Sequence, residues 1–186
     1  LYDDVSGKKI LDLYCFFSTL PLGYNHPIFS TDEFKKDLLV FGGLKPSTGR
    51  ILTSYIDEFV TEFHNYVNKD LFNRYFFIHG GGLAVENSLK IAFDWKRYIN
   101  NQSGVNVDGN ELEIISFNNA FHGITGYTLS VSDNPLKGTH YPKFNWPKFE
   151  EPFIKFPLNK KNINDLKVRE NKVLNEIKEY IENKGN

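Results

Sequence analysis

The pattern of hydrophobic and polar positions changes its period most clearly between residues 74 and 99. Residues 74–78 form an aromatic and β-branched run that is typical of a buried strand, and the three glycines at 80–82 end it. Apolar residues then recur at helical spacing at Val85, Leu89, Ala92, Phe93 and Ile99. The opposite, solvated face takes Glu86, Lys90, Asp94 and Arg97. The pattern predicts a strand, a glycine turn and an amphipathic helix.

The same periods predict the remaining elements. Further helices are expected at residues 31–41, 51–69 and 159–186. A hairpin and a second strand are expected at residues 1–13 and 111–117. The aromatic, proline-rich stretch 133–157 has no clear period, and we expect a long ordered loop, either at a subunit interface or packed within one subunit. Because strands alternate with helices, the fold class is α/β with a parallel sheet.

The glycine turn is the first candidate site. Unpaired N–H groups and the positive end of the helix dipole meet at a helix N-terminus, and glycine lets an anion approach the backbone closely. A phosphate fits this arrangement, although glycines that only form a tight turn explain the pattern equally well. It is not a dinucleotide fingerprint, since Val85 stands where the third glycine would fall. It is not a Walker loop either, because no Gly-Lys-Ser/Thr follows.

A second candidate site follows the strand at 111–117. There the chain reads Phe121-His122-Gly123, and ligands of open α/β sheets bind beyond the carboxyl ends of the strands. The two candidate segments are therefore expected to share one crevice. An aromatic ring beside a histidine can stack on a flat cofactor. The alternative is that Phe121 belongs to the core and His122 is a hydrogen-bonded structural histidine.

Composition narrows the range of functions. The 186 residues are 40% hydrophobic and 16% aromatic, enough for a core in one domain or in part of a larger one. A net charge of −1 gives no electrostatic reason to expect nucleic acid or an anionic membrane as partner. Without a long apolar run or a signal peptide, we expect a cytoplasmic protein. The histidines lack metal-ligand spacing, so no metal is expected. The chain has no methionine, which suggests a fragment of a longer reading frame.

Two segments carry a resemblance to a known family. Residues 77–96, with Ala-Val-Glu-Asn after the glycines, and residues 120–130, with Phe-His-Gly, resemble the class III aminotransferases, most closely the L-lysine 6-transaminases. Supporting similarity follows the same order and reaches about Pro152. The resemblance implies a pyridoxal 5′-phosphate (PLP) enzyme of fold type I that works as a homodimer. Residues 1–44 would be an N-terminal small-domain segment, and residues 45–186 the first part of an incomplete large domain.

The resemblance also implies roles for individual residues. Gly81 and Gly82 match the positions that hold the cofactor phosphate, Phe121 matches the ring that stacks on the pyridine, and His122 follows it. Ile124 stands where the lysine enzymes place an arginine for the substrate carboxylate, and an apolar side chain cannot make that contact. Arg50 is a candidate replacement, and a merely solvated Arg50 is the alternative. The Schiff-base lysine is expected beyond Asn186, so the catalytic residues are unknown and the fragment alone should be inactive.

The expected function is transfer of the terminal amino group of L-lysine, or of a similar ω-amino donor, to 2-oxoglutarate. Two alternatives remain open at this point. One is a non-catalytic module that binds a phosphate ligand. The other is a different PLP enzyme of the same fold type, such as one with another ω-amino acid or diamine donor, a racemase or a decarboxylase.

Overall fold

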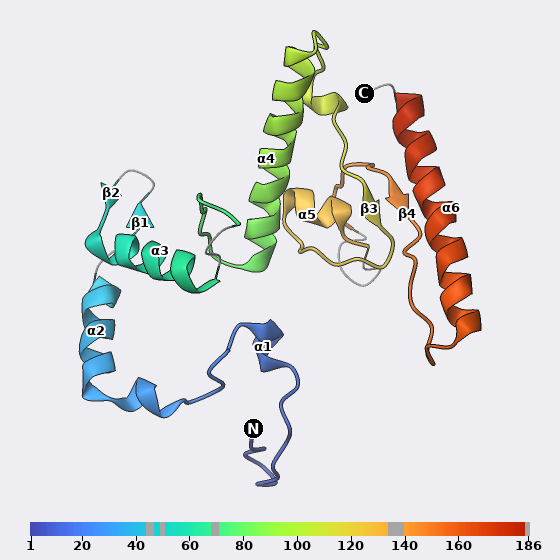
Figure 1. Cartoon of the computed structure of the whole chain (residues 1–186). Coiled ribbons are helices and arrows are strands. Elements are labelled where there is room, and N and C mark those ends of the chain that lie inside the picture. The colour runs from blue at the N-terminus through green and yellow to red at the C-terminus, as the bar shows by residue number, and fades with distance from the viewer. Residues whose placement is uncertain (44–46, 49–50, 68–70, 134–139, 185–186) are drawn as a thin grey trace. The chain divides into compact units, whose positions relative to one another are not determined.

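The chain folds into two compact units, Leu1–Tyr75 and Phe76–Asn186. The structure, a computed structural model, describes residues 1–43, 47–48, 51–67, 71–133 and 140–184 (Figure 1). The expected boundary between residues 44 and 45 lies outside the described residues and stays a prediction. Within the described residues, the buried hydrophobic side chains are Val107, Leu112, Leu129, Val131, Trp146 and Val173. The hydrophobic core therefore belongs to the second unit.

The first unit consists of short elements. In chain order they are α1 (Cys15–Ser18), the 3₁₀ helix η1 (Pro27–Ser30), α2 (Asp32–Gly43), β1 (Ser47–Thr48), β2 (Ile51–Leu52) and α3 (Ser54–Val67). Strands β1 and β2 pair antiparallel. The expected N-terminal hairpin is present as an antiparallel bridge between Tyr2 and Lys9. At the start of α2, Thr31 Oγ1 accepts a hydrogen bond from the Phe34 N–H at 3.3 Å, so Thr31 acts as the N-cap.

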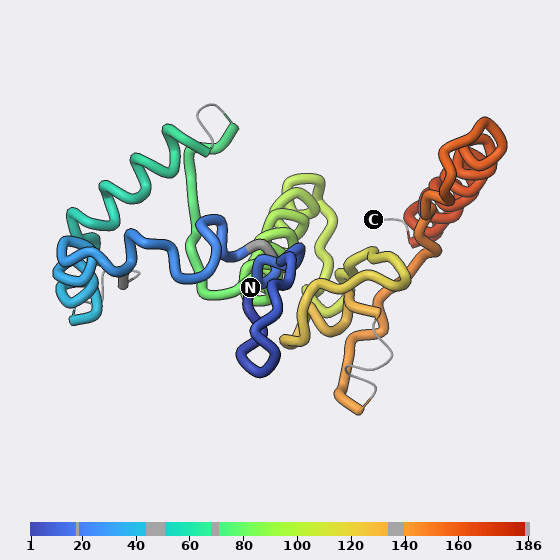
Figure 2. Tube along the Cα trace, turned by 90° about the horizontal axis from the view of Figure 1, so that it is seen from below, coloured from blue at the N-terminus to red at the C-terminus, as the bar shows by residue number. Residues whose placement is uncertain are grey.

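The second unit contains the glycine-turn helix and the sheet. Its elements are α4 (Gly81–Gln102), the 3₁₀ helix η2 (Gly109–Glu111), β3 (Ser116–Phe117), α5 (Gly126–Val131), β4 (Lys148–Phe149) and α6 (Lys160–Lys184). Strands β3 and β4 and helix α5 lie between α4 and α6 in both views (Figure 1, Figure 2). The helices predicted at 81–99 and within 159–186 are confirmed. Among the described residues, no helix has the length and apolar character needed to span a membrane.

The sheet of the second unit is smaller than the sequence predicts. Strand β3 pairs parallel with β4, Ser116 opposite Lys148 and Phe117 opposite Phe149. Residues 111–115 of the predicted strand lie outside this ladder, and residues 74–78 form no ladder with any described residue. A strand is defined by a ladder of backbone hydrogen bonds with a neighbouring strand, so an aromatic and β-branched run does not by itself make one. Conversely, β4 forms inside the stretch expected to be only loop.

An aromatic cluster joins α4 and α5 to the loop before β4. Phe144 stacks on Trp146 with ring centroids 4.8 Å apart and an interplanar angle of 9°. Phe93 of α4 lies 5.6 Å from Trp146 and 5.7 Å from Tyr127 of α5. Phe144 and Trp146, from the stretch 133–157, thus pack within one unit, and the alternative expectation of a subunit interface stays a prediction. The cluster fixes α5 against α4, beside the two candidate segments.

Candidate functional site

The N-terminus of α4 is open to an anionic ligand. Gly80 has φ +87° and ψ 145°, a conformation that glycine adopts without strain, and α4 starts at Gly81 without a side-chain cap. The first N–H groups of a helix have no partner within it. A Cβ built on Gly81 would meet no other atom within 4 Å, so the space beside this turn is free. Backbone donors at the positive end of the helix dipole, with no side-chain cap, suit a phosphate.

The two candidate segments touch at Gly82 and Gly123. A Cβ built on Gly123 would lie 3.0 Å from the Gly82 Cα and 2.9 Å from Thr128 Oγ1. Gly123 also has φ +125°, which side-chain-bearing residues rarely adopt. Only glycine meets both requirements at this position. The structure thus brings the glycine turn and the Phe-His-Gly segment together, as their places after two strands predict.

Hydrogen bonds hold the loop that carries Phe121 and His122. The His122 N–H donates to Ser132 Oγ at 2.9 Å, and Ser132 Oγ–H donates to the Gly123 carbonyl at 2.8 Å. The Asp133 N–H donates to the Ala120 carbonyl at 2.8 Å. The Phe121 side chain is 55% exposed and that of His122 is also exposed. Both residues lie within two positions of the Gly82–Gly123 contact, and their roles toward a cofactor stay predictions.

A carboxylate fixes the beginning of the same loop. Asp133 accepts a hydrogen bond from the Asn119 N–H at 3.1 Å, and Lys148 Nζ lies 3.6 Å from its other oxygen. The Asn119 N–H first, and the charge of Lys148 after it, hold the pKa of Asp133 below its ordinary value. Lys148 belongs to β4, so this ionised carboxylate ties the loop after β3 to the neighbouring strand.

Glu86 is a residue of this site that the sequence analysis placed wrongly. It was assigned to the solvated face of α4, but its side chain is only partly exposed and points at α5. Its Oε2 accepts three hydrogen bonds, from the Thr125 hydroxyl at 2.7 Å and from the N–H groups of Tyr127 and Thr128 at 2.9 and 3.3 Å. The only sequence signal for this contact was Thr125, a preferred N-cap residue before a helix. No feature of the sequence indicates that its hydrogen-bond partner is Glu86, about forty residues away.

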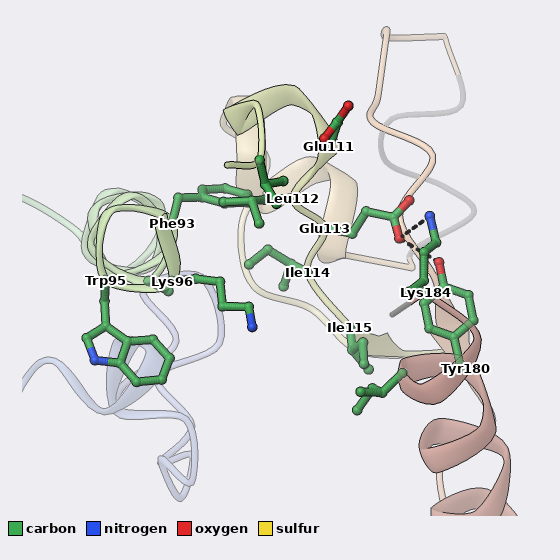
Figure 3. Close-up of a pocket in the computed structure, with 13 residues that line it drawn as sticks. Phe93, Trp95, Lys96, Glu111, Leu112, Glu113, Ile114, Ile115, Tyr180 and Lys184 are labelled. Carbon is green, nitrogen blue, oxygen red and sulfur yellow. Dashed lines mark hydrogen bonds and ion pairs between the residues drawn. The ribbon is translucent and has the colours of Figure 1, made fainter. Parts of the chain in front are cut away.

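A separate apolar cavity of about 280 Å³ lies between the middle of α4, the segment before β3, and α6 (Figure 3). Its walls include Phe93, Leu112 and Ile114. At about 1.5 Å of rise per residue, Phe93 is roughly 17 Å along the helix from Gly82. The cavity is therefore distinct from the glycine turn.

Three polar side chains at the edge of this cavity form hydrogen bonds with one another. Glu113 accepts hydrogen bonds from the Tyr180 hydroxyl at 2.5 Å and from Lys184 Nζ at 3.0 Å (Figure 3). These contacts, led by Tyr180, lower the pKa of Glu113, and the bond to Glu113 raises the pKa of Tyr180. This cluster of Glu113, Tyr180 and Lys184 attaches α6 to the segment before β3. Within the described residues, no group of three or more His, Cys, Asp or Glu side chains is arranged to hold a metal ion.

Comparison with known proteins gives the family. The chain matches the family described as aminotransferase class III over residues 1–186. It belongs to the class III aminotransferases. It is 39% identical to the L-lysine-epsilon aminotransferase of Amycolatopsis lactamdurans over 149 residues, which are 78% of this chain and 32% of that protein. The corresponding enzyme of Streptomyces clavuligerus is 38% identical over the same length.

The structure agrees with this assignment. It is similar to the lysine aminotransferase of M. tuberculosis, with a TM-score of 0.83 and 30% identity, over 98% of this chain and 42% of that one. The predicted resemblance and the fold class, part of a PLP-dependent transferase of fold type I, are confirmed. The chain spans about a third of the length of the curated relatives that it matches.

Proposed function

We propose that this protein is a PLP-dependent transaminase that transfers the terminal amino group of L-lysine, or of a similar ω-amino donor, to 2-oxoglutarate. Its membership of the class III family and its identity to lysine-epsilon aminotransferases support the activity and the donor. The observation that carries the proposal is the contact of Gly82 with Gly123, which puts an uncapped helix N-terminus beside an exposed aromatic ring.

The described residues fit the cofactor. The free space beside Gly81 and the uncapped start of α4 suit its phosphate, which the N–H groups of Gly81 and Gly82 would bind. The exposed Phe121 ring would stack on the pyridine, and His122 would lie beside it. When bound, PLP supplies an electron sink for the carbon that carries the amino group. The Phe121 ring would then cover the face of the cofactor ring on which it stacks and keep water from it.

The donor site is the least specified part of the proposal. Ile124 follows the glycine contact directly, and its side chain is 62% exposed. In our proposal it lies at the edge of the donor site, where an apolar residue suits the methylene chain of an ω-amino donor. The donor carboxylate then needs a cation from elsewhere. Arg50, the candidate for that role, lies outside the described residues.

We further propose that the protein acts as a cytoplasmic homodimer. The extent of uncovered apolar surface supports an assembly. In the first unit alone, Phe17 is 77% and Leu39 is 80% exposed, and such apolar side chains are available for contact with a second subunit.

The test uses the protein as its gene encodes it, supplied with PLP, lysine and 2-oxoglutarate. We expect glutamate to form, and lysine to be a better donor than an α-amino acid without a terminal amine. The Gly82→Pro variant should lose cofactor absorbance and turnover, because proline removes an N–H donor and constrains the turn. Gly82→Ala is the matched control. It keeps the N–H, and its Cβ would lie 3.7 Å from the Gly123 Cα, an ordinary contact.

The outcomes separate the alternatives. A protein that binds PLP without producing glutamate from any amine would be a phosphate-ligand module. Racemised or decarboxylated amino acid as the product would indicate another enzyme of fold type I. Full cofactor retention by Gly82→Pro would show that the phosphate does not lie at this turn.

A further inference from the structure

The link between Glu86 and α5 joins the two halves of the proposed cofactor site. Glu86 lies on the second turn of α4, the helix whose first residues are Gly81 and Gly82. Thr125, Tyr127 and Thr128, which donate hydrogen bonds to Glu86 Oε2, follow the loop of Phe121 and His122. One carboxylate oxygen thus spans a sequence separation of about forty residues, and a charged acceptor gives stronger hydrogen bonds than a neutral one.

Each hydrogen-bond donor around Glu86 has an acceptor, and these bonds fix the geometry of the cluster. The Thr125 hydroxyl proton goes to Glu86, so in the 2.8 Å contact between the two threonine hydroxyls Thr128 is the donor. The Thr125 N–H in turn donates to Thr128 Oγ1 at 2.9 Å. Thr128 is completely buried, and its Oγ1 occupies the place that a Cβ on Gly123 would need. The chain of contacts runs from Glu86 through Thr125 and Thr128 to Gly123.

We propose that Glu86 is a positioning residue, which sets the loop of Phe121 and His122 relative to the N–H groups at the start of α4. The inference rests on the proposed function, because it assumes that the cofactor phosphate and ring use these two elements. Glu86 itself would not contact the cofactor. It accepts hydrogen bonds at the N-terminus of α5, where a negative charge is favourable, and so holds Gly123 against Gly82.

This role differs from a general contribution to stability in what it predicts for two ligands. A phosphate ion needs only the helix start, whereas a pyridoxal compound needs the helix start and the ring-stacking residue at their correct separation. Displacement of the loop should weaken binding of the pyridoxal compound and leave binding of phosphate almost unaffected. Binding sites depend on placement to about 0.5 Å, so the loss of three hydrogen bonds to one oxygen should be measurable.

The experiment compares Glu86→Ala and Glu86→Gln in the complete protein without cofactor, with inorganic phosphate and pyridoxamine 5′-phosphate as probes. Pyridoxamine 5′-phosphate carries an amine in place of the aldehyde, so it cannot react with a lysine and reports on the non-covalent site alone. For Glu86→Ala we expect an increase of about tenfold or more in the Kd of pyridoxamine 5′-phosphate, and of less than about twofold in that of phosphate. Glu86→Gln keeps an acceptor oxygen and should restore most of the affinity.

Amide hydrogen exchange gives a readout that does not depend on any ligand. The N–H groups of Tyr127 and Thr128 should exchange faster in Glu86→Ala, while those in the middle of α4 should be unchanged. Should Glu86→Ala fail to fold, Thr125→Val decides the question, because it removes one hydroxyl donor at constant shape and should act in the same direction. Equal weakening of both ligands, or of neither, would overturn the positioning role. A wild-type protein that binds no pyridoxamine 5′-phosphate would instead overturn the proposed function.

Discussion

The N-terminal end and the middle of α4 are held by different kinds of contact. At its N-terminal end, Gly82 touches Gly123 and Glu86 accepts three hydrogen bonds from the α5 region. In its middle, Phe93 and Trp95 line an apolar cavity of about 280 Å³, and Trp95 is 62% exposed. Backbone contact and hydrogen bonds demand one geometry, whereas apolar contact around free volume tolerates several. The stability of the protein should therefore be sensitive to small substitutions at the contact of Gly82 with Gly123. Substitutions around the cavity should have less effect.

The largest effect is expected for Gly123→Ala. Its Cβ would meet the Gly82 Cα at 3.0 Å and Thr128 Oγ1 at 2.9 Å, and the φ of +125° would be strained in addition. Strain and overpacking together should cost on the order of 3 kcal/mol of unfolding free energy, measured by urea denaturation. Gly82→Ala is the control, with an expected loss of less than about 1 kcal/mol since its nearest contact would be 3.7 Å away. Similar losses for both variants would contradict the conclusion that Gly123 is tightly enclosed whereas Gly82 has room for a Cβ.

The sequence allowed the two glycine segments to be predicted, because their signals are local. Glycines after an apolar run, and a Phe-His-Gly turn after another, predict two strand ends at one edge of a parallel sheet. The two segments do meet, although among the described residues only the second follows a strand, β3. The position of Glu86 could not be predicted, since its charge fits a solvated helix face equally well and its partners lie about forty residues away. Strand β4 was missed for a similar reason. Lys148 and Phe149 pair with β3 through backbone atoms, which leave no side-chain period to read.

The second prediction concerns the cluster that attaches α6. Glu113→Gln removes the carboxylate that binds Tyr180 and Lys184, and the Glu113 side chain is 25% exposed. The expected loss of unfolding free energy at neutral pH is about 0.5 to 1.5 kcal/mol, because solvent screens a charge of this exposure. This is smaller than the loss for Gly123→Ala, although more polar contacts are removed.

The difference in unfolding free energy between wild type and Glu113→Gln should depend on pH in a way that follows from the pKa shifts. The pKa of Glu113 is lowered from an ordinary value of 4.5, so its contribution is complete above that pH and is lost as the pH falls through the folded-state value. The pKa of Tyr180 is raised from 10.0, so its contribution is complete below pH 10.0 and is lost as the pH rises further. The gap between wild type and Glu113→Gln, measured by urea denaturation, should be widest between these limits. A gap that stays unchanged as the pH falls far enough to protonate Glu113 would contradict the role of the carboxylate.

The smallest effect is expected for Lys172→Ala, which removes a charged contact of α6 with Glu150, the residue after β4. Lys172 Nζ lies 3.8 Å from Glu150 and 3.7 Å from Glu176, and the three side chains are 61%, 54% and 43% exposed. Exposed pairs at such distances gain little, because water screens the charges and holding long side chains costs entropy. We expect a loss within about 0.5 kcal/mol that shrinks further in high salt. A loss larger than that of Glu113→Gln would show that surface charge, rather than the half-buried cluster at the cavity, attaches α6.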